Sequence, residues 1–304
     1  MDIAIMIEGQ NGLNWPRWKK IVQLVEDLGF AGLYRSDHFT NSKPPDIDSL
    51  DLWVSFTWLA DNTNRIEFGP LVTPFSFRHP VHTARMASAI DDLSNGRLTL
   101  GLGAGWQDRE HGNFGFPLLD LDGRFLRMEE GLEVVTRLLQ SDQPSDFSGE
   151  FYTLQEAVMV PRPKRPGGPP ILIGGNGEKR TLPLTALYAD EWNAVFTTAD
   201  EVRRLNKILD VLLEEQGRKP GDVRRSLMTG CVFGHSDEKV NAASKVYGEL
   251  TIEELQERGF IIGTGSQVSE QLAKFAETKI DRVMLQWLDL DDLDGLEALA
   301  KSVL

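Results

Sequence analysis

Strand and helix signals alternate along this chain from its first residues to its last. Eight short apolar runs predict β-strands, and a helical pattern follows each of them: Ile3–Ile7, Gly32–Arg35, Ile66–Thr73, Leu98–Leu102, Ile171–Ile173, Trp192–Phe196, Arg225–Phe233 and Arg282–Gln286. Such alternation indicates parallel strands joined by crossover helices. Eight units fit a closed (β/α)8 barrel, the TIM-barrel architecture, better than the alternative, an open doubly wound sheet. We therefore predict an α/β fold of the barrel type.

The predicted helices fill the segments between these strands: Trp15–Leu28, Leu52–Asn62, Val81–Leu93, Gly123–Leu139, Glu178–Ala189, Asp200–Gln216, Asp237–Tyr247, Gln267–Thr278 and Leu293–Val303. A short insertion is predicted as a β-hairpin that pairs Phe147–Leu154 with Ala157–Val160. Segments 107–121 and 248–265 show no pattern that determines their conformation. Because no linker, repeat or low-complexity stretch interrupts the chain, we expect residues 1–304 to form one domain.

Composition excludes several classes of partner. The formal net charge of −14 argues against nucleic acid, because phosphate binding needs a basic surface. No apolar run approaches the ~20 residues that span a bilayer, and no basic segment precedes the apolar start, so neither a membrane anchor nor a signal peptide is expected. The single cysteine, Cys231, excludes an intrachain disulfide and favours a cytoplasmic location. The histidines lack the spacing of a zinc site, so no metal is predicted.

Active sites of such barrels lie at the carboxyl ends of the strands. Polar residues and glycines gather at four of those ends: Ser36–Phe39, Leu71–Pro74, Gly103–Trp106 and Gly174–Gly177. The alternating Gly101, Gly103 and Gly105 remove Cβ atoms where the fourth strand ends, so a flat or bulky ligand can approach there. The pattern predicts a small-molecule site at this end of the barrel.

The glycines after the fifth strand predict a phosphate site. Gly174–Gly177 opens a predicted helix whose free N–H groups attract anions, and Lys179 and Arg180 add positive charge; a plain tight turn is the alternative. The run does not match the G-x-G-x-x-G fingerprint of nicotinamide-binding Rossmann folds.

A histidine and a carboxylate adjoin at only one predicted strand end, at Asp37-His38. Histidine exchanges a proton near neutral pH, and a carboxylate can orient it or raise its pKa. We predict His38 and Asp37 as catalytic, although a loop cap and a packed histidine would give the same pattern. His111 is a candidate for the substrate pocket, with a solvated loop histidine as its alternative. No G-x-S-x-G elbow is present, which argues against hydrolase chemistry.

Motifs along nearly the whole chain carry a family resemblance: Ser36–Phe39, Leu71–Pro74, Phe77–Pro80, Asn95–Arg97, Gly101–Trp106, Pro161–Pro163, Pro169–Gly175 and Ala189–Asn193. The chain resembles the bacterial luciferase-like superfamily of flavin and deazaflavin enzymes. The resemblance implies a (β/α)8 barrel with short insertions and a flavin-type ring at the strand tips. Ser36-Asp37-His38 is most similar to the branch that uses coenzyme F420, a deazaflavin that transfers hydride only.

That resemblance implies a role for each motif. His38 would exchange the proton that accompanies hydride transfer, and Trp106 would form a wall on the substrate side. In the same branch a non-prolyl cis peptide supports the ring, and its position here would be Pro70–Leu71. Arg162, Lys164 and Arg165 are further candidates for the acidic tail of F420. The cofactor-binding residues implied are Asp37, Leu71, Val72, Thr73, Gly103, Ala104, Gly174, Gly175, Asn176, Gly177, Lys179 and Arg180.

Two other functions share the same ring site. FMN is the alternative cofactor, and an FMN enzyme of this family would act as a monooxygenase. A flavin-binding protein without catalytic activity is the second alternative. The preferred function is an F420-dependent oxidoreductase acting on a small organic substrate, and family members are often homodimers.

Overall fold

A parallel β-barrel forms the centre of the molecule. The computed structural model describes residues 1–304. In its main sheet the strands follow the order β3-β2-β1-β12-β10-β9-β8-β5-β4, and Phe68 bridges to Leu98 so that the sheet closes. A further strand, β11 (Ile261–Gly263), pairs with β10 off this path. The barrel strands are β1 Asp2–Ile7, β2 Gly32–Arg35, β3 Glu67–Pro70, β4 Thr73–Pro74, β5 Leu100–Gly103, β8 Ile171–Gly174, β9 Glu191–Val195, β10 Arg224–Phe233 and β12 Arg282–Gln286.

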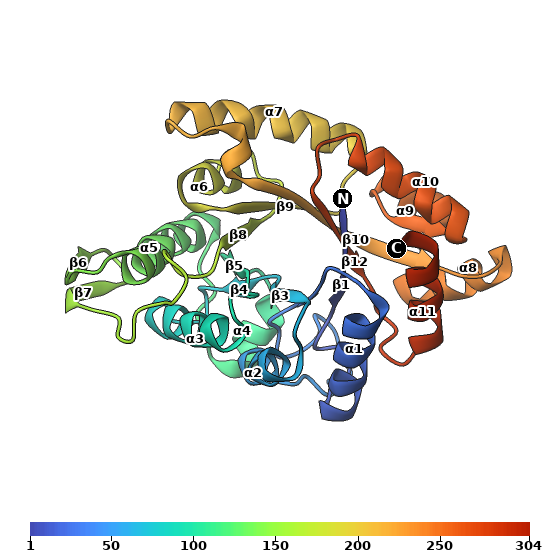
Figure 1. The fold of residues 1–304 in the computed structure, drawn as a ribbon, viewed down its shortest axis with the longest axis horizontal. Helices are drawn as coiled ribbons and strands as arrows, with labels where there is room; N and C mark the ends of the chain where they lie inside the picture. Colours follow the sequence, from blue (N-terminus) through green and yellow to red (C-terminus); the bar gives the residue numbers. More distant parts are fainter.

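Helices surround the barrel, and Figure 1 shows the strands at the centre with the helices around them. A two-stranded antiparallel hairpin, β6 (Ser145–Ser148) with β7 (Thr153–Ala157), lies beside α5. Two 3-10 turns, η1 (Pro220–Asp222) and η2 (Lys245–Tyr247), complete the elements. The helices are α1 Trp15–Leu28, α2 Leu52–Asn62, α3 Pro80–Leu93, α4 Asp108–Phe114, α5 Leu121–Gln140, α6 Thr181–Tyr188, α7 Ala199–Glu215, α8 Asp237–Ser244, α9 Ile252–Glu257, α10 Gly265–Ala276 and α11 Leu293–Val303.

Local signals explain where several helices begin and end. Asn14 accepts a hydrogen bond from the Arg17 N–H at the start of α1, and Gly29 ends that helix with a positive φ of 97°. Asp120 caps α5 in the same way, through the Gly123 N–H. These short-range contacts satisfy backbone groups that a helix end leaves free.

Two apolar clusters hold the barrel together. The larger one lies between the strands and the helices and contains 60 buried residues. The smaller one includes Ala4, Met6, Leu172, Met228 and Met284, and its members come from alternate positions of different strands. Since alternate side chains of a strand point to opposite faces, this second cluster fills the barrel interior. It also supplies the floor of the cavity described below.

The structure corrects several predicted boundaries. The predicted third strand is divided into β3 and β4, and the non-prolyl cis peptide joins Leu71 to Val72 rather than Pro70 to Leu71. The reason is that the Leu71 N–H still donates to the Arg35 carbonyl at 2.8 Å, so the ladder with β2 continues through Leu71. The hairpin strands lie earlier than predicted, at Ser145–Ser148 and Thr153–Ala157.

Segments without a clear pattern also acquire regular structure. The residues after β5 form α4, and the 248–265 segment contains α9 and β11. The helix predicted from Glu178 begins at Thr181, because residues 178–180 form a turn.

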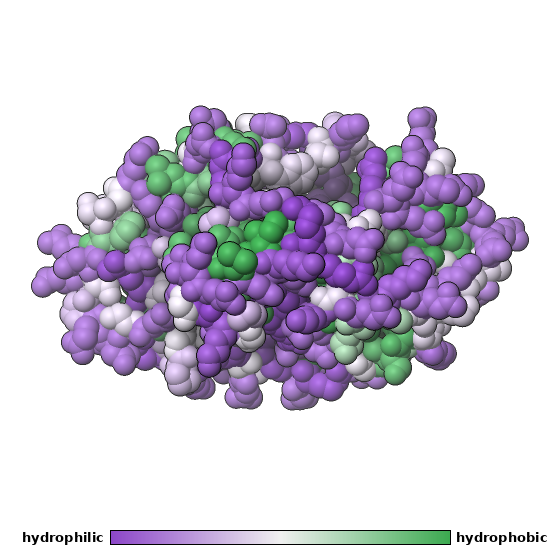
Figure 2. Space-filling view, turned by 90° about the horizontal axis from the view of Figure 1, so that it is seen from above, coloured by the Kyte–Doolittle hydropathy of each residue, from purple (hydrophilic) through white to green (hydrophobic).

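The outer surface is mainly hydrophilic. Figure 2 shows separate apolar patches with hydrophilic residues between them. No helix combines the length and the apolar character that crossing a bilayer would require.

Candidate active site

A cavity of about 260 Å³ opens at the carboxyl ends of the barrel strands. Leu71 and Met228, which belong to the inner apolar cluster, line it from the barrel interior. The complete lining is His38, Leu71, Val72, Pro74, Gly105, Trp106, Glu110, Gly174, Gly175, Asn193, Val195 and Met228. Six of the residues predicted from the sequence meet here: His38, Leu71, Val72, Trp106, Gly174 and Gly175.

His38 is held by a carboxylate from another element. Its Nδ1 lies 2.8 Å from Oε1 of Glu110, on α4, and the second oxygen of Glu110 accepts the Phe39 N–H at 3.1 Å. A carboxylate is an acceptor, so Nδ1 carries the proton of this contact. The Gln107 amide nitrogen, 3.2 Å from the same Nδ1, donates to the Thr40 carbonyl at 3.0 Å. The other ring nitrogen, Nε2, is therefore the one left to exchange a proton.

The environment of His38 raises its pKa. Burial by itself lowers the pKa, because it disfavours the charged imidazolium. The hydrogen bond and the charge of Glu110 act in the opposite direction, with Glu8 and Asp37 adding to them. The net result is a pKa above the ordinary value of 6.5. His38 thus keeps a proton to a higher pH than a free histidine does.

Trp106 stands at the mouth of the cavity. Its side chain is 61% exposed, and its ring meets the His38 imidazole edge to face with centroids 5.6 Å apart. An aromatic ring in this position shields one side of the imidazole while leaving the cavity open to solvent. The role of Trp106 as a wall on the substrate side stays a prediction.

Asp37 faces away from His38 in its contacts. Its carboxylate accepts hydrogen bonds from the Thr73 hydroxyl at 2.7 Å and from two nitrogens of Arg78, at 3.0 and 2.7 Å. Neither Asp37 nor Thr73 lines the cavity. The carboxylate that contacts His38 is therefore Glu110, and Asp37 joins the ends of β2 and β4 through Arg78 and Thr73.

Asn193 places an unpaired acceptor at the cavity. Its side chain is fully buried, and Nδ2 donates to the Ser226 hydroxyl at 2.9 Å. That hydroxyl donates in turn to the Trp192 carbonyl at 3.2 Å, so its remaining role toward Asn193 is that of acceptor. The amide orientation is fixed in this way, and Oδ1 has no partner in the protein. A buried amide oxygen needs a hydrogen bond, which a ligand with an N–H group would supply.

The glycines of β5 allow a neighbouring segment of the barrel to pack closely against this strand. A Cβ at Gly101 would overlap the Pro70 carbonyl oxygen, and one at Gly103 would overlap the Val72 side chain. Gly103 and Ala104 do not line the cavity, whereas Gly105, with a φ of +81°, does. The missing side chains thus allow the close approach of the segment that carries Leu71 and Val72. The prediction of a direct ligand clearing at Gly101 and Gly103 is replaced by this indirect role.

The turn after β8 is tied to the next strand. The Asn176 amide donates to the Val195 carbonyl at 2.7 Å and accepts the Val195 N–H at 3.0 Å, so its polar atoms are occupied. Gly177 and Lys179 are exposed, and Arg180 forms an ion pair with Asp122. Only Gly174 and Gly175 of this group reach the cavity.

The basic residues that precede β8 lie at the other end of the barrel. Arg162 pairs with Asp142 just after α5, and Arg165 pairs with Asp91 near the end of α3. Because they come before the amino end of β8, they are far from the strand tips. These residues, with Lys164 between them, are therefore not positioned to hold a ligand tail at the cavity.

His111 is buried rather than solvated. Its Nδ1 contacts the Gln107 carbonyl at 2.7 Å, and its ring packs against Phe77. It does not line the cavity. The sequence interpretation also missed Glu110 and Asn193. Asn193 could have been found as a polar residue within a predicted strand, but Glu110 lay in a segment without a readable pattern.

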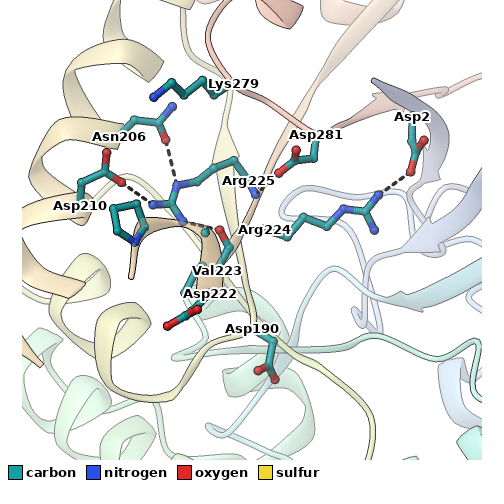
Figure 3. A pocket seen from close by; sticks show the side chains of 12 residues that line it. Asp2, Asp190, Asn206, Asp210, Asp222, Val223, Arg224, Arg225, Lys279 and Asp281 are labelled. Atoms are coloured by element: carbon teal, nitrogen blue, oxygen red, sulfur yellow. Dashed lines mark hydrogen bonds and ion pairs between the residues drawn. The ribbon is translucent and has the colours of Figure 1, made fainter. Parts of the chain in front are cut away.

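A larger cavity of about 810 Å³ lies at the amino ends of the strands, beside Asp2 and Arg224. Figure 3 shows Arg224 directed at Asp2 and Arg225 directed at Asn206 and Asp210. Charges that are already paired leave little to bind a substrate. Since catalysis in these barrels occurs at the carboxyl ends, the cavity beside His38 is the candidate active site.

The comparison with protein families agrees with this architecture. The model of a family described as luciferase-like monooxygenase matches residues 1–253. The chain belongs to this family. An F420-dependent glucose-6-phosphate dehydrogenase of Amycolatopsis mediterranei is 27% identical over 290 residues, which cover 92% of this chain and 82% of the relative. A pyrimidine monooxygenase RutA of Pseudomonas savastanoi is 31% identical over 207 residues, 62% of this chain and 56% of the relative. Both relatives are oxidoreductases, and this chain is an enzyme of that class.

Solved structures of other oxidoreductases share the fold. An F420-dependent secondary alcohol dehydrogenase, in complex with an F420-acetone adduct, matches with a TM-score of 0.84 and 16% identity, over 99% of this chain and 98% of its own. EDTA monooxygenase from Chelativorans sp. BNC1 matches with a TM-score of 0.82 and 17% identity, over 100% of this chain and 92% of its own. At such low identity these matches describe the barrel alone.

Proposed function

We propose that this enzyme is an F420-dependent oxidoreductase that transfers a hydride between C5 of the deazaflavin and a small organic substrate. The observation that carries the proposal is the His38–Glu110 pair, with its 2.8 Å contact, at the edge of a cavity at the strand tips. Two F420-dependent dehydrogenases, which this chain matches over most of their length, add support.

The cavity suits the ring portion of this cofactor. Leu71, Val72 and Met228 provide apolar contacts, and the free Oδ1 of Asn193 fits the imide N–H that deazaflavin and flavin rings both carry. A volume of about 260 Å³ is slightly below the range of roughly 300–1,000 Å³ typical of small-molecule sites. The ring would therefore occupy the cavity, and the anionic tail would extend out of it from the side that Gly174 and Gly175 line. Lys179 is the nearby basic residue that forms no ion pair in the structure.

The bound deazaflavin would supply the hydride donor or acceptor. The protein supplies the proton. With Nδ1 held by Glu110, Nε2 of His38 gives a proton to a substrate oxygen during reduction or removes one during oxidation. Trp106 limits the access of water to the imidazole from one side.

FMN is the second candidate cofactor, because the pyrimidine monooxygenase relatives are as similar in identity as the F420-dependent ones. The lining of the cavity does not distinguish F420 from FMN, because its apolar contacts and the free Oδ1 of Asn193 suit the ring of either cofactor. Titration of the purified protein with F420 and with FMN, followed by the fluorescence of each, separates them. We expect F420 to bind more tightly; tight FMN binding without an F420 response would overturn the proposal.

Substitution of His38 tests its role in proton transfer. His38→Ala should reduce turnover about 10²- to 10⁴-fold, the usual contribution of a general acid or base, and change cofactor affinity much less. His82→Ala is the matched control, because His82 lies on α3 and does not line the cavity. Equal turnover in the His38 variant and the control would remove His38 from the mechanism.

The assembly remains a prediction. We propose a homodimer, on the basis of the family alone. Light scattering coupled to size-exclusion chromatography gives the mass in solution, and a mass equal to the 34.0 kDa of one chain would contradict the proposal.

A further inference from the structure

A second pocket lies outside the candidate active site. It has a volume of about 360 Å³ and is formed by the ends of β10 and β12 together with α8 and η2. Eight of its ten lining residues are hydrophobic, among them Phe233, Ala243, Val246 and Trp287. It shares no lining residue with the cavity beside His38. Its size falls within the usual range for small-molecule sites.

The chemistry of the lining is apolar and uncharged in its interior. Cys231 is buried, and burial raises the pKa of its thiol to about 12, so the thiol stays neutral. Two carboxylates, Asp289 and Asp292, also line the pocket, but both are exposed and each already accepts a backbone N–H. Asp292 caps α11 through the Gly295 N–H, and Asp289 accepts the Asp291 N–H.

Two of the residues that line this pocket carry hydrogen-bond donors without a partner. The indole Nε1 of Trp287 and the hydroxyl of Tyr247 are both buried, and neither contacts an acceptor in the protein. The Trp287 side chain is 93% buried, since its exposed fraction is 7%. The buried indoles of Trp18 and Trp192 donate to the carbonyls of Ser55 and Gly175, whereas the indole of Trp53 also lacks a partner. A buried donor without an acceptor costs free energy that a suitable ligand would recover.

We propose that this pocket is a second binding site, which takes a small apolar molecule carrying an acceptor oxygen, such as a cyclic ketone. The apolar walls bind the carbon skeleton, and the Trp287 N–H donates to the oxygen, with the Tyr247 hydroxyl as a second donor in the same pocket. The pocket lies at the carboxyl ends of β10 and β12 and shares no lining residue with the cavity beside His38.

Fluorine NMR with a gem-difluorinated cyclohexanone tests the proposal on the full-length protein. The matched ligand is gem-difluorocyclohexane, which has the same skeleton without the carbonyl. We expect the difluorinated ketone to bind more tightly than difluorocyclohexane. Trp287→Phe keeps an aromatic ring but removes the N–H. It should weaken ketone binding about three- to tenfold, the equivalent of one hydrogen bond. Binding of difluorocyclohexane should not weaken.

Two further variants locate the bound ketone. Ala242→Leu adds bulk to an exposed helical residue that lines the pocket, and it should weaken binding of both ligands without harm to the fold. Trp58→Phe alters a tryptophan in a different apolar groove, beside Trp15 and Val54, and should leave binding unchanged. Equal ketone binding in wild type, Trp287→Phe and Ala242→Leu would overturn the proposal, and so would a loss confined to Trp58→Phe.

Discussion

At the scale of single residues, the proposed chemistry depends on the imidazole of His38 and the carboxylate of Glu110. The two groups come from the end of β2 and from α4, 72 residues apart in the sequence. The carboxylate orients the ring through Nδ1 and stabilises its charged form. Such a pair makes the protonation of Nε2 sensitive to a single distant side chain.

Glu110→Gln should lower the pKa of His38. The amide keeps a hydrogen-bonding oxygen but loses the negative charge, so the imidazolium loses its main stabilising partner. An NMR titration can follow His38 directly, since the chain has only 5 histidines. Glu8→Gln is the comparison, because Glu8 acts through its charge alone and should lower the pKa less. Equal shifts in the two variants would contradict the assigned role of Glu110.

Asp37 has a different role from Glu110, because it pairs with Arg78 and not with His38. Asp37→Asn removes the charge that pairs with the partly buried Arg78, and we expect a loss of about 2 kcal/mol in the free energy of unfolding. Urea unfolding measures this loss. Asp46→Asn is the control, because its pair with Arg109 is exposed and should contribute little. If the two variants are equally stable, Asp37 does not join the strand ends as described.

At the scale of elements, the approach of β5 to the third-strand segment shapes the cavity. Gly101→Ala would place a Cβ against the Pro70 carbonyl, and backbone on both sides leaves no flexible group to move away. We expect a loss of about 1–3 kcal/mol, as for other overpacked interiors, together with weaker cofactor binding because Leu71 and Val72 shift. Thermal unfolding and the fluorescence titration measure the two effects.

A second glycine provides the control for this element. Gly112 lies in α4, where an added Cβ meets nothing within 4 Å, so Gly112→Ala should be neutral or stabilising. Unchanged stability of the Gly101 variant would show that β5 and the segment around Pro70 are less closely packed than described.

At the scale of the whole molecule, the pH dependence of stability records the protonation of His38. Its pKa is raised above 6.5 in the folded protein, so folding favours its protonated form. The stability contributed by His38 is fully present below the unfolded pKa of about 6.5 and is lost as pH rises through the higher folded pKa. We expect the difference in unfolding free energy between wild type and His38→Gln to decrease over this window. Urea unfolding at several pH values measures it, and a difference that grows with pH would contradict the sign.

Other titrating groups act on both proteins in that comparison. Asp91, for example, has a raised pKa because of burial, and it changes stability equally in wild type and in the His38 variant. Only the difference between the two proteins therefore isolates the histidine.

The sequence by itself determined the barrel and the end of it at which the candidate site lies. Apolar runs such as Ile3–Ile7 and the helical patterns between them are local properties of the sequence. A chain in which strands and helices alternate can form only a few topologies. The positions of His38, Val72, Trp106 and Gly174 at strand ends follow from the same reading. Four such residues then meet in one cavity because parallel strands bring their carboxyl ends together.

Only the tertiary structure decided which groups are partners. The neighbour of His38 in the sequence, Asp37, binds Arg78, whereas Glu110 reaches His38 from a helix that no pattern indicated. The free oxygen of Asn193 likewise results from its contact with Ser226, 33 residues away. Hydrogen bonds depend on ångström distances between segments far apart in the chain, and periodicity carries no information about such distances. For that reason the sequence indicated where the candidate site lies, and the fold determined which groups meet there.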